Sequence, residues 1–568
     1  MPLVHKKRMR RAARRRPAAH WWLHLGVIVA LVGLLLPAPA VLAESTAATA
    51  LPVLRLELAA EPQTLDPQRA VGPDEIAVVR QLYEPLLRFD TELRPQPALA
   101  ERVQSNADNT VWTFTLRANA RWSDGEPVTA AQVRDGWLRM MTREIPDELS
   151  RPFQVIENAR FFRVNLIVNP AAVGVQALDD RTLQVTTENP APHLPMIAAL
   201  PGAVPYRGDA PSPRGERAAG TVENPLHIGN GPFRLTAWHP GEVLRLEPNP
   251  YYWGGPPAVA LEIHLPYSAL PANGEDALTR FRAGRRDIVV VPPERVAEVL
   301  ADRPVGARVL RQPLPQTTWL SLNVTREPFD TVEVRRALSY ALDRRAIIRN
   351  ARGDVGQPAY GLLPPGVPGH NSGAGVGREA NATTALLMLE AADWNVPWGP
   401  GFGGQDLPRF TLRYPALPQP TRLAFAIRDQ LAYALGIWIR LDPLDPIGYA
   451  HALETKDFEL ALSGWTSTYP DPEAWFWLTF GEGKLANRTG WSNRVFDRLW
   501  RAAEGAPTEE ERLRLYHTAQ HLITEEAPAI FLMHGERLIL VREGIAGIEP
   551  ALMDDLPGAA SLSRARVG

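Results

Sequence analysis

The sequence predicts a mixed α/β fold. Predicted strands and helices of ordinary length recur along the whole chain, and they do not alternate strictly as they would in a parallel barrel. The chain has 568 residues, enough for three or four domains or for one large folding unit made of lobes. Its 45% hydrophobic and 22% charged residues are typical of a soluble globular protein. These values exclude a multi-span membrane protein, a collagen and a generally disordered chain.

The first half of the chain is expected to be rich in strands. Val53–Leu58 alternates apolar and polar residues, as does Thr110–Arg117, and this alternation indicates a half-buried strand. Asp74–Leu87 instead places its apolar residues at helical spacing. Thr129 can cap a helix over Ala130–Met141. Further strands are predicted at Thr182–Thr187, Phe233–Trp238, Leu244–Glu247 and Asp287–Val291, and a further helix at Glu275–Ala283.

The second half is expected to contain longer helices. Thr331–Asn350 has the pattern of one long amphipathic helix, and Thr508–Ala527 has the pattern of another. Segments rich in proline and glycine are predicted as loops. These loops are Pro201–Glu223, Gly361–Gly377 and Pro397–Gly404; the other predicted elements are the helices Leu423–Leu435 and Asn493–Ala503 and the strands Thr318–Val324, Phe458–Trp465 and Phe531–Val541.

The first 43 residues have the pattern of an export signal. A basic region ends at Arg16, and an apolar run covers Leu25–Leu36. The stretch Pro37–Ala43 (PAPAVLA) follows, with small or short apolar side chains at Val41 and Ala43. The apolar run is shorter than the roughly 20 residues that span a bilayer. We therefore expect a signal peptide at residues 1–43, cleavage after Ala43, and a periplasmic protein. The alternative is that the segment is kept as a membrane anchor.

Charge and cysteine content exclude several classes of protein. Eight of the 61 basic residues lie within the first sixteen positions, and no acidic residue precedes Glu44. The rest of the chain therefore carries 53 basic and 63 acidic residues, which argues against binding of nucleic acid. Because the chain has no cysteine, disulfides, zinc–thiolate sites, iron–sulfur clusters, a cysteine nucleophile and a lipid-anchored cysteine are all excluded.

One cluster has the spacing of a metal site. His517, His521 and Glu525 follow one another at four-residue intervals, on one face of a predicted helix. The zinc-protease helix needs a glutamate directly after the first histidine, where this chain has Thr518. A solvated helix face is the competing interpretation. Neither a GxxxxGK[ST] phosphate loop nor a GxSxG nucleophile motif occurs, so we expect no enzyme, no cofactor and no metal.

The segment Ala461–Trp475 (ALSGWTSTYPDPEAW) has a different character. A predicted strand leads into an aromatic residue, a short polar stretch and a proline-stiffened turn. Unpaired backbone groups at such a strand end can form hydrogen bonds with an extended ligand. A plain hairpin in which Trp465 is packed is the alternative that spacing alone leaves open.

Nine segments carry a family resemblance. They are QTLDPQ (Gln63–Gln68), LYEPLLRFD (Leu82–Asp90), WTFTLRANARWSDGEPVTA (Trp112–Ala130), LDDRTLQVT (Leu178–Thr186), NGPFRLTAW (Asn230–Trp238), RLEPNPYYWG (Arg245–Gly254), RFRAGRRDI (Arg280–Ile288), LNVTREPFDTVEVRRALSYALDRRAII (Leu322–Ile348) and FELALSGWTSTYPDP (Phe458–Pro472). Together and in this order they resemble the extracytoplasmic solute-binding proteins of peptide and nickel ABC importers. The oligopeptide-binding branch is the most similar.

The resemblance implies a mixed α/β clamp with three lobes and two hinges. Lobe I would comprise residues 51–83, 207–305 and 529–568, lobe II residues 84–206, and lobe III residues 306–528. The ligand would lie between lobes I and III and would be buried when the hinges close. The protein would be a monomer that delivers its ligand to a membrane permease driven by ATPases in separate chains.

The resemblance also implies which residues bind the ligand. Two extended segments flank the peptide in the family, and they correspond here to Ala70–Pro73 and Ser463–Thr468. The turn that follows the second segment adds two further candidates. The expected ligand-binding residues are Ala70, Val71, Gly72, Pro73, Ser463, Gly464, Trp465, Thr466, Ser467, Thr468, Tyr469 and Asp471.

The sequence departs from the family pattern at both ends of the expected peptide. Peptide-binding members hold the peptide amino terminus with an aspartate three residues after the tryptophan, where this chain has Thr468. Asp471, Asp74 and Glu75 are the nearby acids that can replace it. The stretch Phe458–Gly464 also lacks the basic residues that can bind the peptide carboxylate in the oligopeptide branch.

The sequence thus predicts a periplasmic peptide-binding subunit of an ABC importer, with a peptide and a permease as partners. Two alternatives stay open. The same fold can bind a metal chelate, a haem, a blocked or modified peptide or an opine-like compound. A secreted metal-dependent hydrolase that uses His517, His521 and Glu525 is the more remote alternative.

Overall fold

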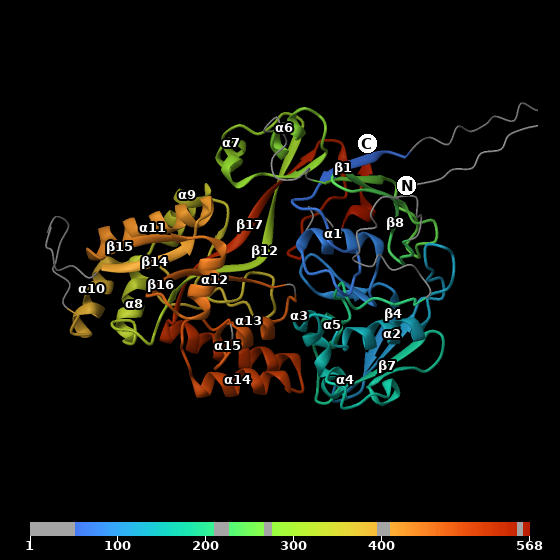
Figure 1. The fold of residues 1–568 in the computed structure, drawn as a ribbon, viewed down its shortest axis with the longest axis horizontal. Helices are drawn as coiled ribbons and strands as arrows, with labels where there is room; N and C mark the ends of the chain where they lie inside the picture. Colours follow the sequence, from blue (N-terminus) through green and yellow to red (C-terminus); the bar gives the residue numbers. More distant parts are fainter. Residues whose placement is uncertain are drawn as a thin grey trace, which may run out of the picture. The chain divides into compact units, whose positions relative to one another are not determined.

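Three β-sheets form the framework of the structure (Figure 1). The computed structural model describes residues 51–208, 227–265, 275–394, 409–467, 469–484, 486–553 and 561–568. The signal peptide predicted at residues 1–43 and Thr468 both lie outside these residues. Within the described part, no helix is both long and apolar enough to cross a membrane.

The first sheet has four strands in the order β1-β10-β9-β8. Strand β1 (Val53–Glu57) pairs in parallel with β10 (Ala260–His264), and alternate aliphatic side chains of both strands are buried. Strands β9 (Val243–Pro248) and β8 (Phe233–His239) extend the sheet as an antiparallel hairpin. The alternation in the sequence predicts these strands because each buries one face.

The second sheet has the order β4-β5-β7-β6 and is antiparallel throughout. Its central strand β5 shows the predicted alternation, with Trp112, Phe114 and Leu116 buried. The strands are β4 (Ala100–Ser105), β5 (Val111–Leu116), β6 (Val175–Ala177) and β7 (Thr182–Thr186).

Helix α2 (Ala130–Met140) begins where the sequence predicts. The Thr129 side chain accepts a hydrogen bond from the backbone amide of Gln132, and the Gln132 side chain accepts one from the amide of Thr129 at 2.9 Å. These two bonds form a capping box. Gly136 brings the helix against neighbouring backbone, because a Cβ at this position would lie 2.2 Å from the carbonyl oxygen of Val204.

The third sheet has seven strands in the order β11-β17-β12-β16-β14-β15, and β13 also pairs with β17. Its helices lie around β14–β16 in Figure 1, with α11 beside β14 and β15. The strands are β11 (Ile288–Val290), β12 (Ala307–Leu322), β13 (Gln357–Pro358), β14 (Arg409–Pro415), β15 (Trp438–Leu444), β16 (Leu460–Thr466) and β17 (Ala529–Arg542).

Strands β12 and β17 form a long antiparallel pair. Figure 1 shows the pair running from the region of α6 and α7 to the part of the sheet that holds β16. The pairing is regular from Ala307 to Pro313, shifts, and resumes at Thr317 opposite His534. Pro313 and Pro315 have no N–H to donate, so the ladder is interrupted at this point.

The prediction of one continuous helix over Thr331–Asn350 is wrong. The structure has two helices, α8 (Val332–Ala341) and α9 (Arg344–Arg352). The Asp343 side chain accepts a hydrogen bond from the amide of Ala346 at 3.0 Å and so starts a new helix. The periodic apolar pattern continues through this break because both helices pack on the same core.

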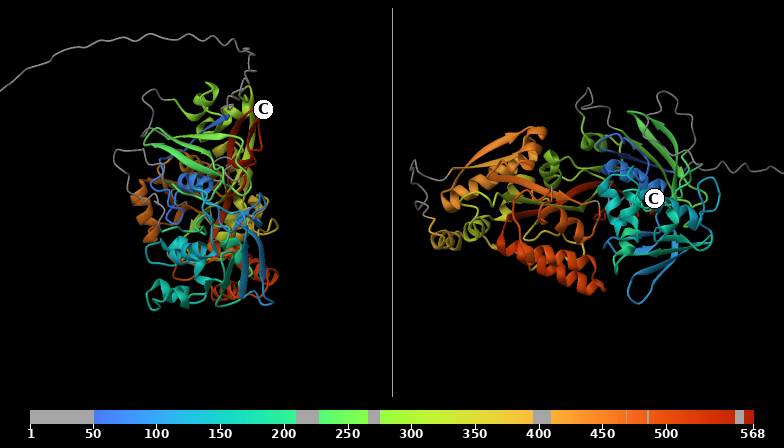
Figure 2. Two further views of the ribbon diagram at one scale, coloured as in Figure 1. Left: turned by 90° about the vertical axis from the view of Figure 1, so that its right-hand side faces the viewer. Right: turned by 60° about the horizontal axis from the view of Figure 1, so that its bottom comes forward.

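Most of the remaining elements are short, and the longest described helices are α11 and α15, with 18 residues each. Helix α14 (Arg494–Glu504) packs beside α15 (Glu509–Glu526) (Figures 1 and 2). The other helices are α1 (Pro73–Leu82), α3 (Asp147–Ser150), α4 (Ala159–Arg163), α5 (Leu194–Ile197), α6 (Ala277–Arg282), α7 (Val296–Ala301), α10 (Ala382–Ala391), α11 (Pro418–Leu435), α12 (Pro446–Glu454) and α13 (Pro472–Phe480); the other strands are β2 (Leu87–Phe89), β3 (Pro95–Pro97), β18 (Ile545–Ala546) and β19 (Arg566–Val567).

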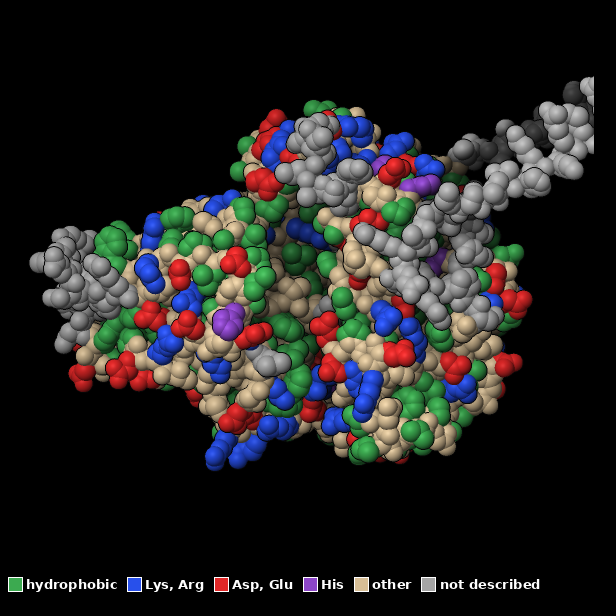
Figure 3. Space-filling model, in the orientation of Figure 1, with side chains coloured by type: hydrophobic (Ala, Val, Ile, Leu, Met, Phe, Trp, Pro, Cys, Tyr) green, Lys and Arg blue, Asp and Glu red, His purple; other side chains and the backbone are tan. Residues whose placement is uncertain are grey.

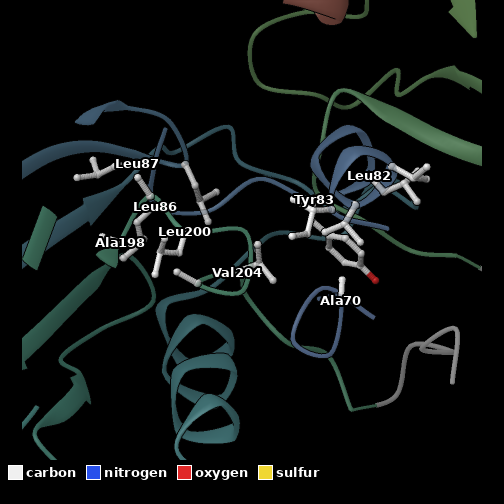
Figure 4. Packing of buried hydrophobic residues seen from close by; sticks show 14 of the residues in the cluster. Ala70, Leu82, Tyr83, Leu86, Leu87, Ala198, Leu200 and Val204 are labelled. Atoms are coloured by element: carbon white, nitrogen blue, oxygen red, sulfur yellow. The ribbon is translucent and has the colours of Figure 1, made fainter. Parts of the chain in front are cut away.

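One hydrophobic cluster joins the first sheet and α1 to the second sheet. Part of it is shown in Figure 4, where Ala70 and Tyr83 belong to the same cluster as Leu200 and Val204. The first sheet lies within the ranges predicted for lobe I and the second within lobe II, while the third sheet takes strands from the ranges of lobes I and III. The lobe boundaries themselves stay a prediction.

Candidate functional site

The two segments predicted to flank the ligand line one cavity. This cavity has a volume of about 370 Å³. Ala70, Val71 and Pro73 contribute to one side, and Thr466, Ser467 and Tyr469 contribute from the end of β16 and the turn after it. The volume lies within the range of small-ligand pockets in proteins. Ligand binding in this cavity stays a prediction.

The segment before α1 is held by a buried carboxylate. Glu75 accepts hydrogen bonds from the backbone amides of Gln63 at 2.9 Å and of Val71 and Gly72 at 3.0 Å. Since these N–H groups are satisfied within the protein, this segment has only carbonyl groups left for a ligand. The carbonyls of Ala70 and Val71 accept no hydrogen bond from any described residue.

Asp74 is also engaged by the protein backbone. Its carboxylate accepts hydrogen bonds from the amides of Ala59 at 3.1 Å and Ala60 at 2.7 Å. Burial raises the pKa of Asp74, although these bonds and the charge of Arg537 act in the opposite direction. Asp74 and Glu75 therefore hold loops on their own side of the cavity.

Strand β16 has one open edge. It pairs with β12 along its whole length, from Leu460 to Thr466, but with β14 only at Leu460 and Ala461. Beyond Ala461 this edge has no strand partner among the described residues, and the Tyr449 hydroxyl donates to the carbonyl of Leu462. Gly464 and Thr466 are exposed. An extended ligand can pair with such an edge through backbone hydrogen bonds.

A second cavity lies along the same strand. It has a volume of about 430 Å³, and Ser463, Gly464 and Trp465 contribute to its lining. It meets the first cavity at Gln316 and Thr466, which line both and which are paired across β12 and β16. Figure 3 shows a hollow between the part of the molecule that holds β16 and the part that holds α1.

Trp465 is half-buried at this second cavity. Its indole packs against the hydrophobic cluster that contains Trp475 and Phe476. The indole Nε1 is buried and has no hydrogen-bond partner among the described residues. Trp465 therefore lines the second cavity and also packs against this hydrophobic cluster.

Asp471 does not suit the role of an ammonium ligand. Its side chain is fully buried, it accepts a hydrogen bond from the amide of Glu473 at 2.9 Å, and it is ion-paired with Arg512 of α15. Burial is the largest single influence and raises the pKa of Asp471, but the charge of Arg512 and the hydrogen bonds from Arg512 and the Glu473 amide act together to lower it below its usual value. The sequence distance between Asp471 and Trp465 does not show where the Asp471 side chain points. Its direction follows from the position of Asp471 as the N-cap of α13.

The histidines of α15 do not form a metal site. In the part of the chain that the structure describes, no group of three or more histidine, aspartate or glutamate side chains is arranged to hold a metal ion. The Glu525 carboxylate accepts a hydrogen bond from Arg336 at 2.9 Å. This arrangement disfavours the metal-dependent hydrolase.

Charged residues near the two cavities come from distant parts of the sequence. Arg80, Glu148 and Arg537 line the first cavity, and Arg352 and Arg488 line the second. The Arg537 side chain donates to the Gln312 side chain at 3.1 Å. Sequence reasoning missed all five residues because none lies within a segment that matched the family.

The short 3-10 helix η1 (Arg151–Val155) lies in the range predicted for lobe II, and its first residue contacts helices α13 and α14. Arg151 donates to Glu473 at 2.8 Å and to Glu504 at 3.3 Å, and its guanidinium lies 3.5 Å from the centre of the Trp477 ring. Burial and the neighbouring Glu473 raise the pKa of Glu504 to about 7. One arginine thus holds two carboxylates that repel each other.

Comparison with known proteins identifies the family. The model of the middle region of the bacterial extracellular solute-binding proteins, family 5, matches residues 94–487, which is more than half of the chain. The chain belongs to this family. Its members are binding proteins for transport, so the chain is the substrate-binding protein of an ABC importer of the peptide and nickel type, and it is not an enzyme, as the sequence predicts.

Individual relatives are similar over most of their length. The periplasmic oligopeptide-binding protein OppA of Salmonella typhimurium is 28% identical over 504 residues, 86% of this chain and 88% of that protein. The probable deoxycholate-binding periplasmic protein YgiS of Escherichia coli is 28% identical over 525 residues, 91% of this chain and 95% of that protein. These family-5 relatives confirm the resemblance that the nine segments indicated.

Solved structures of the family confirm the fold. The unliganded open form of the periplasmic murein tripeptide-binding protein MppA superposes with a TM-score of 0.74 at 24% sequence identity. The superposition covers 91% of this chain and 98% of that one. The mixed α/β binding-protein fold that the sequence predicts is therefore confirmed.

Proposed function

We propose that this family-5 protein captures extended peptides in the periplasm and delivers them to a membrane permease. The observation that carries the proposal is the open edge of β16 beside a cavity that Ala70 and Val71 also line. One side offers backbone groups of a strand, and the other offers carbonyl groups without partners among the described residues. Backbone hydrogen bonds of this kind bind a peptide independently of the identity of its side chains.

Closure on the peptide requires a hinge, and we place one hinge in the β12–β17 pair. The ladder is interrupted between Pro313 and Thr317, opposite Gly535. Leu314, Pro315 and Gln316 at this interruption also line the first cavity. Bending here would therefore move β16 relative to the segment before α1. Only the closed state would contact the ligand from both sides, so ligand binding would favour closure.

A second candidate function keeps the same clamp and changes the ligand. Asp471 and Glu75 are occupied by protein groups, and Glu148 is the one acidic residue among the described residues that line the two cavities. A buried ammonium group without a counter-charge is unfavourable. This favours a ligand without a free amino terminus, such as a blocked peptide, a metal chelate, a haem or an opine-like compound. YgiS, which is 28% identical, is named as a probable deoxycholate-binding protein.

Native mass spectrometry of protein purified without added ligand tests the proposal. We expect the exported chain, with Glu44 as its first residue, to carry bound species whose masses and fragments are those of mixed peptides. A single retained mass with no peptide fragments would contradict the peptide proposal and support the second candidate. Membrane-bound protein with the full-length mass would contradict export with cleavage after Ala43.

A further inference from the structure

The first cavity has an apolar wall that comes from the range predicted for lobe II. The residues that form this lobe II wall are Met140, Leu149, Pro152, Phe153 and Leu200. Except for Pro152, they belong to, or pack against, the hydrophobic cluster that joins the first two sheets. The wall is therefore part of one apolar surface, and it is additional to the two lobes between which the family resemblance places the ligand.

The lobe II wall is supported by the core behind it. The Phe153 ring is buried and contacts the Trp137 ring edge-to-face, with 5.4 Å between the ring centres. The Trp137 indole donates a hydrogen bond to the carbonyl of Ala203 at 3.2 Å. Gly202 leaves room for Met140, because a Cβ at position 202 would lie only 3.0 Å from the terminal methyl carbon of Met140. A wall that is already formed binds a ligand group at little cost in ordering.

Residues of the lobe III range line the same cavity. Tyr469, which precedes α13, lines it and belongs to the same hydrophobic cluster as Phe153. Arg151, the first residue of η1, lies directly before Pro152 and Phe153 in sequence and contacts α13 and α14. Arg151 does not itself line the cavity. Its contact therefore fixes how close the lobe II wall lies to the part of lobe III that holds Tyr469.

Water is a poor occupant of the space beside the lobe II wall. Glu148 is the one residue with a polar side chain among the described lobe II residues that line the cavity, and it is exposed. A buried water molecule needs about two to four polar partners, which apolar side chains do not offer. A ligand group that displaces such water gains affinity when it is apolar. The wall therefore favours an apolar ligand group.

We propose that the lobe II wall forms an apolar subsite through which the clamp selects ligands with a bulky apolar group, and that Arg151 is the positioning residue that keeps lobe III beside this wall. The inference rests on the proposed function and deepens it, because binding through the backbone alone would be indifferent to side chains. A leucine side chain gains affinity from burial that a polar side chain of similar size does not gain. The expected difference is about ten-fold or more in Kd.

Tetra-alanine with one substituted residue supplies the ligands for the test. Leucine or asparagine is placed at each of its positions in turn, which gives matched pairs of similar size that differ in polarity. Calorimetric titration of the exported chain measures each affinity. We expect the leucine member of one pair to bind at least about ten-fold more tightly, and that pair identifies the position that meets the wall.

Leu149→Asn is the variant for the wall itself, and Leu166→Asn is its control. Leu149 is half-buried and lines the cavity, whereas Leu166 is 74% exposed and lines neither cavity. We expect Leu149→Asn to reduce the preference for leucine to less than about three-fold and Leu166→Asn to leave it unchanged. Equal affinities within every pair would overturn the subsite and leave peptide binding intact. A full preference in Leu149→Asn would also overturn it.

Arg151→Gln tests the positioning role. We expect this variant to lose the preference for leucine, since lobe III is no longer held beside the wall. A role in stability alone would weaken both members of a pair equally, and the preference would persist. That result would contradict the positioning role. The unfolding midpoint checks that the variant is folded.

A second measurement tests the subsite even if no peptide binds. The methionine methyl groups are labelled with carbon-13, and each signal is assigned by its loss in a variant with leucine at that position. Met140 and Met553 line the first cavity, while Met388 of α10 lines neither cavity. Apolar protein cavities can bind benzene, and we expect benzene to give saturable shifts of the Met140 and Met553 signals but not of the Met388 signal.

The benzene titration separates the subsite from the proposed function. These shifts in a chain that binds none of the peptides would support the subsite and contradict peptide capture. Benzene that shifts no methionine signal, or that shifts the Met388 signal as strongly as the Met140 signal, would overturn the subsite.

Discussion

Replacing Asp471 with asparagine is expected to lower the free energy of unfolding by about 3–5 kcal/mol. The Asp471 and Arg512 side chains are 0% and 1% exposed, and they are ion-paired. Asparagine has nearly the same shape but no charge, so Arg512 would remain buried beside a neutral group. The measurement is urea-induced unfolding followed by intrinsic fluorescence. A loss of less than about 1 kcal/mol would contradict this account of the buried pair.

An exposed ion pair provides the matched control for Asp471→Asn. The Asp429 carboxylate accepts a hydrogen bond from Arg428 at 2.7 Å, but its side chain is 65% exposed. Asp429→Asn is therefore expected to change stability by less than about 1 kcal/mol. The two substitutions remove the same carboxylate charge, and they differ in burial.

The effect of Asp471→Asn should also depend on pH. Burial raises the pKa of Asp471, but the charge of Arg512 and the hydrogen bonds to the carboxylate together outweigh burial, so the pKa is lowered in the folded state. A lowered pKa stabilises the fold above the unfolded-state pKa of about 4, and this stabilisation is lost as the pH falls through the folded-state pKa. The difference between the wild type and Asp471→Asn is therefore expected to shrink below pH 4.

Trp465→Ala is expected to weaken ligand binding by about 2 kcal/mol, or about 30-fold in Kd, and to leave the fold intact. Trp465 lines the second cavity, along β16, and packs against the hydrophobic cluster that contains Trp475 and Phe476. Calorimetric titration with tetra-alanine measures the change in affinity. Circular dichroism and the unfolding midpoint check that the variant is folded.

Trp438→Ala is the control for the loss of an indole. Trp438 lies on β15, is 58% exposed and lines neither cavity. Its substitution is expected to leave the affinity for tetra-alanine unchanged. Similar losses of affinity in both variants would show that truncating a tryptophan weakens binding indirectly. This result would contradict a direct contact between Trp465 and the ligand.

Much of the fold could be predicted from the sequence because local rules and tertiary packing agree. The alternation of β5 and the Thr129 capping box each depend on a few neighbouring residues, and both are present. The break at Asp343 was missed because an apolar stripe does not show whether one helix or two carry it. Asp343, an aspartate that can cap a helix, lies inside this apolar pattern and was the available signal for a second helix.

The candidate site could be predicted only where it consists of contiguous backbone. The segments around Ala70 and Ser463 line the cavities, and their residues are adjacent in sequence. Arg352, at the end of α9, and Arg488, in the loop after α13, are more than a hundred residues apart in sequence and line the same cavity. The direction of the Asp471 side chain depends on the cap of α13 and on Arg512, which sequence spacing does not reveal.

The most direct test of the clamp is a distance measured across the cleft with and without peptide. The chain has no cysteine, so spin labels at Pro240→Cys and Tyr433→Cys would be the only thiol-linked groups. Both positions are exposed, one in the β8–β9 turn and the other on α11. Electron double resonance should show a shorter, narrower distance distribution when tetra-alanine saturates the protein. An unchanged distribution under conditions where calorimetry shows full binding would contradict closure on a peptide.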